Sequence, residues 1–266
     1  MKEKLIVRCE RAIPIDETIG KSILIKGKTR EHEGRVVLLT EQDIPRIIDL
    51  EEMTNIPSIR ASREKILRRF EKGNMMLGFE IDNDYVYQQK RLIGDLAWRF
   101  AYFLPERPED LPKDFEGYST PNHFPPANFN AMFHYGINVS PKIREEGLGR
   151  QVLKHVFEAM FSQGKKNGCE FVVFDPRLYT YNGSSEYPEI EGRIPQDPKM
   201  KEAVDKAMKG EREFTLQDAL RDPILHIYNK TLLKQGELKF VRLMPSSWFP
   251  PDKPSGGFGV YCYKEL

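Results

Sequence analysis

The segment that most restricts the fold runs from residue 133 to residue 174, where a strand, a glycine-containing turn, a helix and a second strand follow one another closely. Phe133 to Val139 is typical of a strand, and Ser140-Pro141 ends it. Gln151 to Gln163 then carries its apolar residues on one helical face. The run Phe171-Val-Val-Phe174 predicts a central strand that is covered on both faces. The segment therefore predicts two parallel strands joined by a right-handed helical crossover.

The turn before this helix has the composition of a phosphate-binding loop. A diphosphate needs several converging backbone N–H donors, and a helix N-terminus supplies them together with a favourable dipole. Gly147 and Gly149 let the backbone approach a ligand closely, and Arg144 and Arg150 can add charge-assisted hydrogen bonds. A dinucleotide-binding loop would need a small residue where Val152 stands. An ordinary strand-to-helix turn without a ligand is the alternative, and the flanking strand, proline and arginine favour binding.

The overall charge gives no reason to expect a polyanionic partner or a membrane. Lys and Arg total 41 against 40 for Asp and Glu, a net charge of +1, so we expect no nucleic-acid partner. No apolar run approaches the about 18 residues that a membrane span needs. The first residues lack the apolar core of a signal peptide, and three scattered cysteines offer neither a disulfide framework nor a zinc site. We therefore expect a cytoplasmic protein without a bound metal.

The rest of the chain alternates strands and helices around that unit. Residues 1–34 contain two short strand-like runs and are interpreted as an N-terminal arm or hairpin, and 35–266 as one domain with an insertion at 176–221. Strands are expected at 36–39, 75–81, 92–102, 238–244 and 258–263, and helices from Asp43, from Ser62 to Lys72, at 198–209 and from Pro223 to about Lys234. The segment 103–128 has no periodicity and is expected to be a long loop.

The phrase from Ile137 to Arg150, Ile-Asn-Val-Ser-Pro-Lys-Ile-Arg-Glu-Glu-Gly-Leu-Gly-Arg, resembles the acetyl-CoA loop of the GNAT acyltransferases. The order of the elements from Arg35 onward is also similar to that fold. The resemblance implies an α/β protein whose central mixed sheet is splayed between its fourth and fifth strands. The phrase Asp222-Pro-Ile-Leu225 is further similar to the acetyltransferase half that is found fused to carbon-nitrogen hydrolases.

The resemblance implies acetyl-CoA, or another acyl-CoA, as a co-substrate in the splayed opening. Backbone groups near Val139 would pair with pantetheine, and the following loop would hold the pyrophosphate. The implied cofactor-binding residues are Ile137, Asn138, Val139, Arg144, Glu145, Glu146, Gly147, Leu148, Gly149 and Arg150.

Transfer to an amine needs a proton acceptor and a donor for the departing thiolate. His134, Asp95 and Asp175 are the candidate bases, and the sequence does not choose among them. Tyr228 occupies the position where the family often has a tyrosine near the sulfur. Three of these residues also have a structural interpretation: His134 as a strand histidine, Asp175 as a turn residue before Pro176, and Tyr228 as a helical tyrosine in the core.

The function expected is transfer of an acetyl or short acyl group from CoA to a small-molecule or peptide amine. An acyltransferase that takes its acyl group from acyl carrier protein, and a CoA-binding module without catalysis, are the alternatives. The acceptor would be selected by 103–128 and 176–221, which carry no recognisable motif. The oligomeric state is left open, a homodimer included.

Overall fold

The computed structural model describes the chain except for residues 1–4, 8–11, 29–30, 56–59, 82–90, 146, 184–194, 233–236, 250–251 and 253–254. The predicted loop residue Glu146 lies outside the described residues. Among those described, no helix has both the length and the apolar composition needed to cross a membrane. Nor do the described residues bring three or more His, Cys, Asp or Glu side chains into an arrangement that could hold a metal ion.

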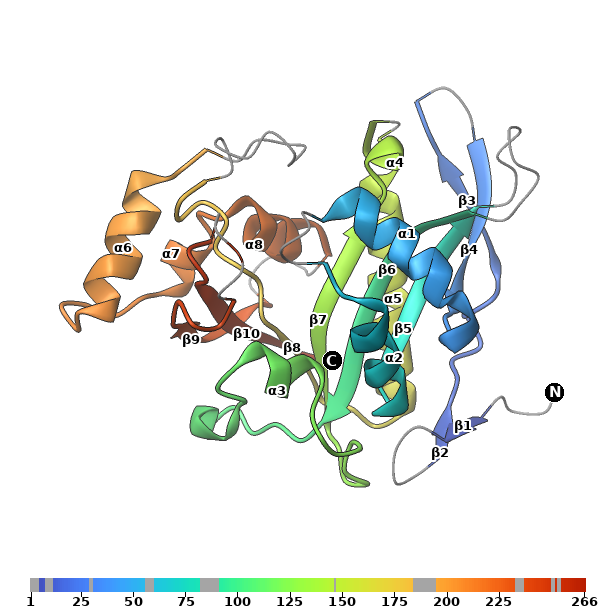
Figure 1. Ribbon diagram of the computed structural model, residues 1–266, viewed down its shortest axis with the longest axis horizontal. Coiled ribbons are helices and arrows are strands. Elements are labelled where there is room, and N and C mark those ends of the chain that lie inside the picture. Colours follow the sequence, from blue (N-terminus) through green and yellow to red (C-terminus); the bar gives the residue numbers. More distant parts are fainter. Residues whose placement is uncertain are drawn as a thin grey trace.

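One large mixed sheet forms the centre of the molecule (Figure 1). Within the described residues it has eight strands, in the order β3 (Ser22–Lys26), β4 (Glu31–Leu38), β5 (Met75–Ile81), β6 (Arg91–Ala101), β7 (Ala131–Val139), β8 (Phe171–Phe174), β10 (Gly259–Glu265) and β9 (Lys239–Met244). Every neighbouring pair is antiparallel except β7 and β8, which are parallel. The predicted parallel crossover through the intervening helix is therefore confirmed.

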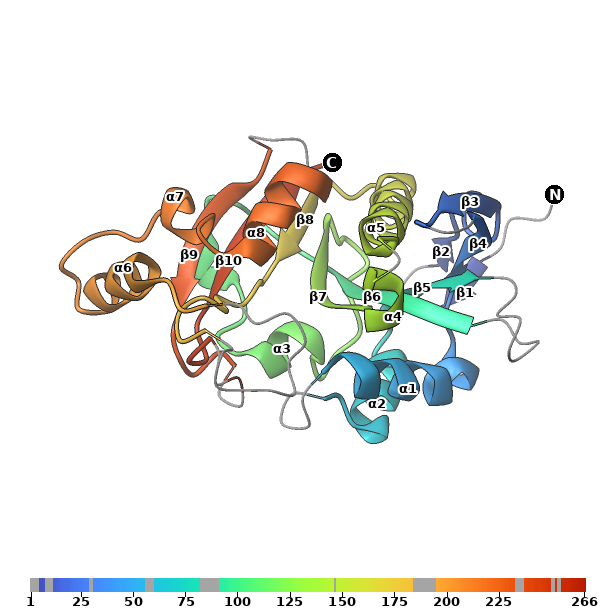
Figure 2. The same ribbon diagram turned by 90° about the horizontal axis from the view of Figure 1, so that it is seen from above.

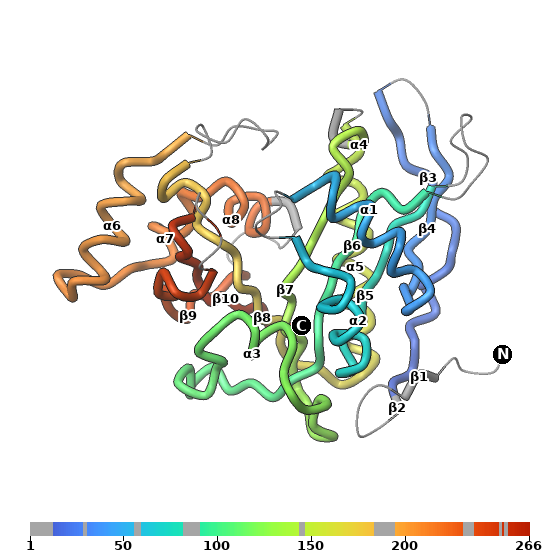
Figure 3. Tube along the Cα trace, in the orientation of Figure 1, coloured from blue at the N-terminus to red at the C-terminus, as the bar shows by residue number. Residues whose placement is uncertain are grey.

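The N-terminal residues add to the edge of this sheet. β3 pairs with β4 along its whole length, so the strand predicted at 36–39 begins earlier and continues the sheet outward. The strands β1 (Leu5–Val7) and β2 (Ala12–Pro14) form a separate two-stranded sheet. Figure 3 shows the blue trace of β3 and β4 running along one edge of the molecule.

Helices cover both faces of the sheet (Figure 2). One face carries α1 (Ile44–Thr54), which follows the single turn η1 (Glu41–Asp43), and α2 (Arg63–Glu71). The other face carries α5 (Gly149–Lys166), which packs on β5, β6 and β7. The Ser62 hydroxyl accepts a hydrogen bond from Lys65 N at 3.2 Å, so the predicted cap of α2 is confirmed.

Two buried apolar clusters lie on the two faces of the sheet. The cluster under α5 includes Leu96, Trp98, Val156 and Phe157, and the cluster under α1 and α2 includes Ile47 and other residues of those helices. The remaining helices are η2 (Pro108–Asp110), α3 (Phe115–Ser119), α4 (Pro141–Glu145), α6 (Pro198–Met208), α7 (Leu216–Ala219), α8 (Pro223–Ile227) and the π-helical turn η3 (Tyr228–Leu232). The segment 103–128, expected to be a loop, therefore contains two short helices.

Candidate active site

The strands β7 and β8 diverge at the centre of the sheet. Their parallel pairing begins at Ala131 and Phe171 and ends at His134 and Phe174, where β8 stops while β7 continues to Val139. We call this point, after His134 and Phe174, the strand fork. Beyond it, the edge of β7 that faced β8 has no neighbouring strand in the described part of the chain. Backbone groups on a strand edge without a partner can pair with an extended ligand.

The Tyr118 side chain closes the base of the strand fork. Its hydroxyl lies 2.9 Å from the carbonyl oxygen of His134 on β7 and 2.9 Å from that of Val173 on β8. The side chain is fully buried, and burial raises the pKa of Tyr118 well above its usual range, so the phenol keeps the proton that it donates. One hydroxyl thus serves both strands where they separate.

A cavity of about 180 Å³ opens at the strand fork. It is several times larger than the roughly 30 Å³ that one water molecule occupies in the liquid. The walls come from β7, from the segment that follows β8, and from α1, α2 and α8. They include Glu51, Asn55, Arg60, Lys65, Arg69, Phe115, His134, Tyr135, Gly136, Ile137, Asn138, Asp175, Arg177, Tyr179, Ile224, Tyr228 and Phe249.

A β-bulge shapes the β7 wall of the cavity. Ala97 of β6 pairs with Gly136, but the next residue, Trp98, pairs with His134, so Tyr135 has no partner across the strands. An extra residue in one strand interrupts the ladder and redirects its backbone groups. Both Tyr135 and Gly136 line the cavity, so the interruption lies at the level of the strand fork.

The glycine turn after β7 leads into α5 with the expected geometry. Gly147 has a φ of +76°, a conformation that a side chain disfavours. The Leu148 amide donates to Ile143 O at 3.0 Å, and α5 begins at Gly149. The amides of the first helical turn, from Gly149 to Gln151, have no acceptor inside the helix. The loop therefore offers amide donors and a helix dipole together; the side chains of Arg144 and Glu145 lie outside the described part of the structure.

The N-terminal strands reach this loop, which the sequence did not indicate. Gln151 on α5 accepts a hydrogen bond from Lys26 N at 3.2 Å and donates to Lys26 O at 2.8 Å. A methyl group placed on Gly147 would lie 3.6 Å from Cε of the exposed Lys28 side chain. The Lys28 side chain therefore lies beside the turn that carries these amide donors.

Two carboxyl groups share one amide on the α1 side of the cavity. Asn138 Nδ2 donates to Asp95 Oδ1 at 3.0 Å and to Glu51 Oε1 at 3.1 Å. Its Oδ1 accepts from Asn55 Nδ2 at 2.8 Å and from the Thr54 hydroxyl at 3.1 Å. Asn138 was predicted to be part of the CoA site. Its side chain instead forms hydrogen bonds on the α1 face of β7, and α5 covers the other face.

Asp95 is the more deeply buried member of this pair. Burial, and then the neighbouring Glu51 charge, raise the pKa of Asp95 well above its usual range. Asp95 is 2% exposed and does not line the cavity, whereas Glu51 does. Glu51 was not among the predicted bases, because it lies on α1, far along the chain from the recognised motif.

Of the other predicted catalytic residues, His134, Asp175 and Tyr228 all line the cavity. Burial lowers the pKa of His134 to about 3, so its imidazole is neutral, and its buried Nε2 has no hydrogen-bond partner among the described residues. Burial raises the pKa of Asp175 well above its usual range, which favours its protonated form. A base that is nearly impossible to protonate and an acid that is already protonated are both poorly suited to accept the proton of an ammonium ion near neutral pH.

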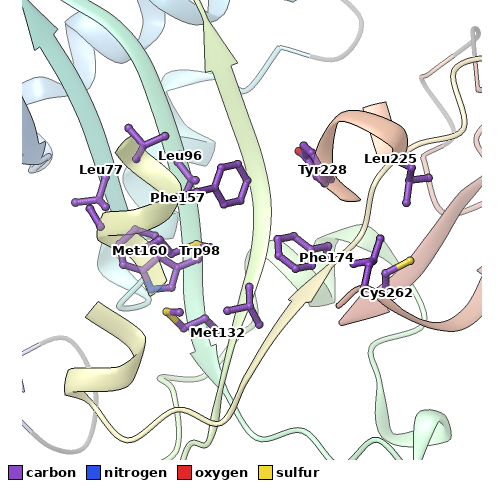
Figure 4. Packing of buried hydrophobic residues seen from close by; sticks show 14 of the residues in the cluster. Leu77, Leu96, Trp98, Met132, Phe157, Met160, Phe174, Leu225, Tyr228 and Cys262 are labelled. Atoms are coloured by element: carbon purple, nitrogen blue, oxygen red, sulfur yellow. The ribbon is translucent and has the colours of Figure 1, made fainter. Parts of the chain in front are cut away.

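Tyr228 lies at the start of η3, directly after α8. Asp222 begins α8 as its cap, accepting from Ile224 N at 3.0 Å, and also accepts from Thr180 N at 3.0 Å. The centroid of the Tyr228 ring lies 5.9 Å from that of Phe174 and 6.2 Å from that of His134. Figure 4 shows the Tyr228 ring facing the end of β8. Burial raises the pKa of Tyr228, so its phenol remains a proton donor.

Two arginines complete the cavity wall on the α2 side and beside β8. Arg69 on α2 is 7% exposed and stacks over the Tyr135 ring at 4.8 Å. Arg177, just after β8, stacks over the Phe249 ring at 5.0 Å, and its Nη1 lies 3.6 Å from Asp252 Oδ2. Neither arginine was predicted, since no local pattern distinguishes them from surface arginines.

Comparison with known proteins identifies the fold of this chain. No family model matches the sequence, and no curated protein matches it. Its structure is similar to that of the GphF GNAT-like decarboxylase in complex with isobutyryl-CoA, with a TM-score of 0.56, 18% identity and coverage of 87% of this chain and 98% of that one. It is also similar to the loading GNATL domain of CurA from Lyngbya majuscula, with a TM-score of 0.54, 16% identity and coverage of 87% and 97%. The predicted GNAT fold, with its mixed sheet splayed between β7 and β8, is therefore confirmed.

Proposed function

We propose that this protein is an acyltransferase that moves an acyl group, acetyl in the first instance, from CoA to an amine. Three features that are contiguous in the chain carry the proposal. The unpaired edge of β7, the Gly147 turn and the N-terminus of α5 follow one another between residues 137 and 150. They lead from the cavity at the strand fork to a set of amide donors suited to a pyrophosphate.

On the donor side, the chain supplies backbone groups and one flexible cation. Backbone groups of Ile137 and Val139 would pair with the pantetheine arm, and the amides of Gly147, Gly149 and Arg150 would hold the pyrophosphate. Lys28 would add a charge to the same phosphates from the N-terminal strands. The similarity to GphF, whose structure is a complex with isobutyryl-CoA, supports this choice of ligand.

On the acceptor side, Glu51 is our candidate for the base. It lines the cavity, and hydrogen bonds from Asn138 and Asn55 orient its two oxygens. Glu51 accepts the proton of the bound ammonium ion, and the neutral nitrogen then attacks the thioester carbonyl. As the nitrogen–carbon bond forms, backbone amides at the Tyr135 bulge face the developing negative charge on the carbonyl oxygen.

Breaking the carbon–sulfur bond releases a thiolate, which needs a proton. Tyr228 donates its phenolic proton, and the second proton lost by the nitrogen restores the phenol. Both Tyr228 and His134 border the cavity, but the neutral, weakly basic His134 imidazole is left with a packing role against the Tyr228 ring. Asp95, whose pKa is raised by burial, lies behind Asn138 and accepts a hydrogen bond from its amide, which helps to hold that amide in place.

Isothermal titration with CoA and with acetyl-CoA tests the donor site. We expect saturable binding of both, and binding that is absent at millimolar ligand concentration would refute the proposal. A thiol-release assay with a panel of amines then tests transfer, with mass spectrometry of the acylated product.

The same assays separate the other activities. Faster turnover with an acylated carrier protein than with acyl-CoA would identify the carrier protein as the donor. Binding without turnover would indicate a CoA-binding module. Loss of CO2 from a carboxylated acyl-CoA, without an acylated product, would replace transfer by decarboxylation, the activity for which GphF is named.

A further inference from the structure

Arg69 is a buried cation that forms no ion pair with any described residue. Its Nε donates to the Thr120 hydroxyl at a long 3.4 Å, and its guanidinium stacks on Tyr135. Within the described part of the chain, no carboxylate oxygen lies within 4.0 Å of it, and no acceptor is bonded to its two terminal nitrogens. The structure thus leaves the planar end of this side chain free at the wall of the cavity.

Another buried arginine shows what a purely structural role looks like here. Arg99, on the neighbouring strand β6, is 5% exposed and also stacks on an aromatic ring, that of Phe133, at 4.9 Å. Its Nε donates to Tyr118 O at 2.5 Å and its Nη2 to Gly117 O at 3.4 Å, and it does not line the cavity. Arg99 therefore holds α3 in place, whereas Arg69 has no comparable set of acceptors.

None of the acids around the cavity forms an ion pair with Arg69 among the described residues. Burial raises the pKa of Asp95 and that of Asp175 more than the Arg69 charge lowers them, which weakens the negative charge that either can offer Arg69. Glu51 instead accepts hydrogen bonds from Asn138 and Asn55. An arginine cannot lose its proton in a protein, so a buried guanidinium without an anion is costly unless a ligand supplies one.

Arg177 extends the positive wall on the opposite strand. Its side chain is 22% exposed, and its Nη1 is buried without a hydrogen-bond partner among the described residues, although Asp252 is near. Cations thus stand at the α2 wall and beside β8, and a carboxylate with its orienting amides stands on the α1 side. The planar guanidinium group of an arginine can donate two parallel hydrogen bonds to the two oxygens of a carboxylate.

We propose that the acceptor is a small amine that also carries a carboxylate, such as an amino acid. Its carboxylate binds Arg69, with Arg177 as a second cation, and its ammonium group faces Glu51. This inference rests on the proposed acyl transfer for the identity of the reacting group, but the carboxylate site itself depends only on the cavity. The aromatic walls formed by Phe115, Tyr135 and Phe249 leave room for a side chain.

The test compares glycine, alanine, leucine, phenylalanine and glutamate with their carboxamides, which keep the amine but lose the negative charge. Each is titrated calorimetrically into the full chain, both free and saturated with CoA, and is then assayed with acetyl-CoA. We expect at least one amino acid to bind and react at least about tenfold better than its amide. Amides that bind and react as well as the acids would overturn the proposal.

Variants at Arg69 connect the preference to this residue. Arg69→Met keeps the length and removes the charge, and we expect it to weaken amino-acid binding by about 10- to 100-fold while leaving amide binding unchanged. Arg69→Lys should restore part of the affinity. Arg68→Met is the matched control, since Arg68 is the adjacent, exposed arginine of α2 and pairs with Glu116. Thermal unfolding of each variant identifies any that fails to fold, in which case Arg69→Lys alone carries the comparison.

The outcomes separate this proposal from the proposed function. If CoA does not bind but an amino acid binds in an Arg69-dependent manner, acyl transfer fails and the carboxylate site stands. If CoA binds and no amino acid does, the carboxylate acceptor is excluded and acyl transfer stands. If Arg69 proves to be needed for a dicarboxylic acyl-CoA rather than for the amine, the carboxylate belongs to the donor, and our assignment to the acceptor is wrong.

Discussion

Replacing Tyr118 by Phe removes one oxygen from the base of the strand fork and changes little else. The ring remains stacked on Phe133 at 5.0 Å, but the carbonyl oxygens of His134 and Val173 each lose a donor that lies 2.9 Å away. A buried polar group that loses its partner costs about 1–3 kcal/mol. We therefore expect the free energy of unfolding of Tyr118→Phe to fall by about that amount.

Thermal unfolding measures this loss directly. In a chain of this size, the midpoint should fall by roughly 2–4 °C for each kcal/mol. Tyr102→Phe is the control, because Tyr102 is 50% exposed and its substitution should change the free energy of unfolding by less than about 0.5 kcal/mol.

The same variant should also slow acyl transfer, although Tyr118 does not line the cavity. If the hydroxyl sets the separation of β7 and β8, its loss shifts the cavity walls relative to one another, and small displacements of reacting groups reduce rates strongly. An unfolding midpoint and a transfer rate both equal to those of Tyr102→Phe would refute the reasoning. Such a result would mean that the two carbonyl groups do not depend on this hydroxyl.

Three further changes test the two sides of the site. Glu51→Gln should lower kcat for acyl transfer by about 100-fold or more without abolishing CoA binding, since it removes a base and keeps the size of the side chain; an unchanged kcat would exclude Glu51. Asp95→Asn mimics the protonated acid. Because the folded pKa of Asp95 is raised above its ordinary value of 3.8, the wild type loses stability as pH rises from that value through the folded pKa. The unfolding midpoint of the variant should therefore rise relative to that of the wild type between pH 4 and pH 8. A difference in midpoint that does not depend on pH would contradict this. Lys28→Ala should raise the Kd for CoA about two- to fivefold at low salt and hardly at all at high salt, compared with Lys21→Ala at the other end of β3; equal effects would remove Lys28 from the site.

Short-range patterns were sufficient for most of the elements. Ser62 caps α2 as expected, and the strand predicted at 75–81 is β5 with the same bounds. α3 escaped prediction because its five residues have no amphipathic period. It is formed by the Asp114 side chain, which accepts from Gly117 N at 2.7 Å, and by the burial of Tyr118. A helix this short depends on tertiary contacts more than on its own sequence.

The sequence could name candidate proton-transfer groups but could not rank them. His134, Asp95 and Asp175 look alike as titratable residues near strand ends, and their pKa values differ from the ordinary ones because of burial. Burial depends on packing from both faces of the sheet, which no local pattern records. The same limit applies to Glu51, whose partner Asn138 is 87 positions away.

By itself, the sequence determined the unit from residue 133 to residue 174 and, through the resemblance of 137–150, the GNAT fold. A strand, a glycine turn and a helix that are contiguous in the chain are set by local backbone preferences and apolar period. The tertiary structure alone decided the chemistry of the cavity. It brought Glu51 and Arg69 from two helices into one cavity with Arg177, left Arg69 without an ion-pair partner among the described residues and buried Asp95. These properties arise from long-range packing and desolvation, because a charge acquires its partner and its pKa only after the chain has closed around it.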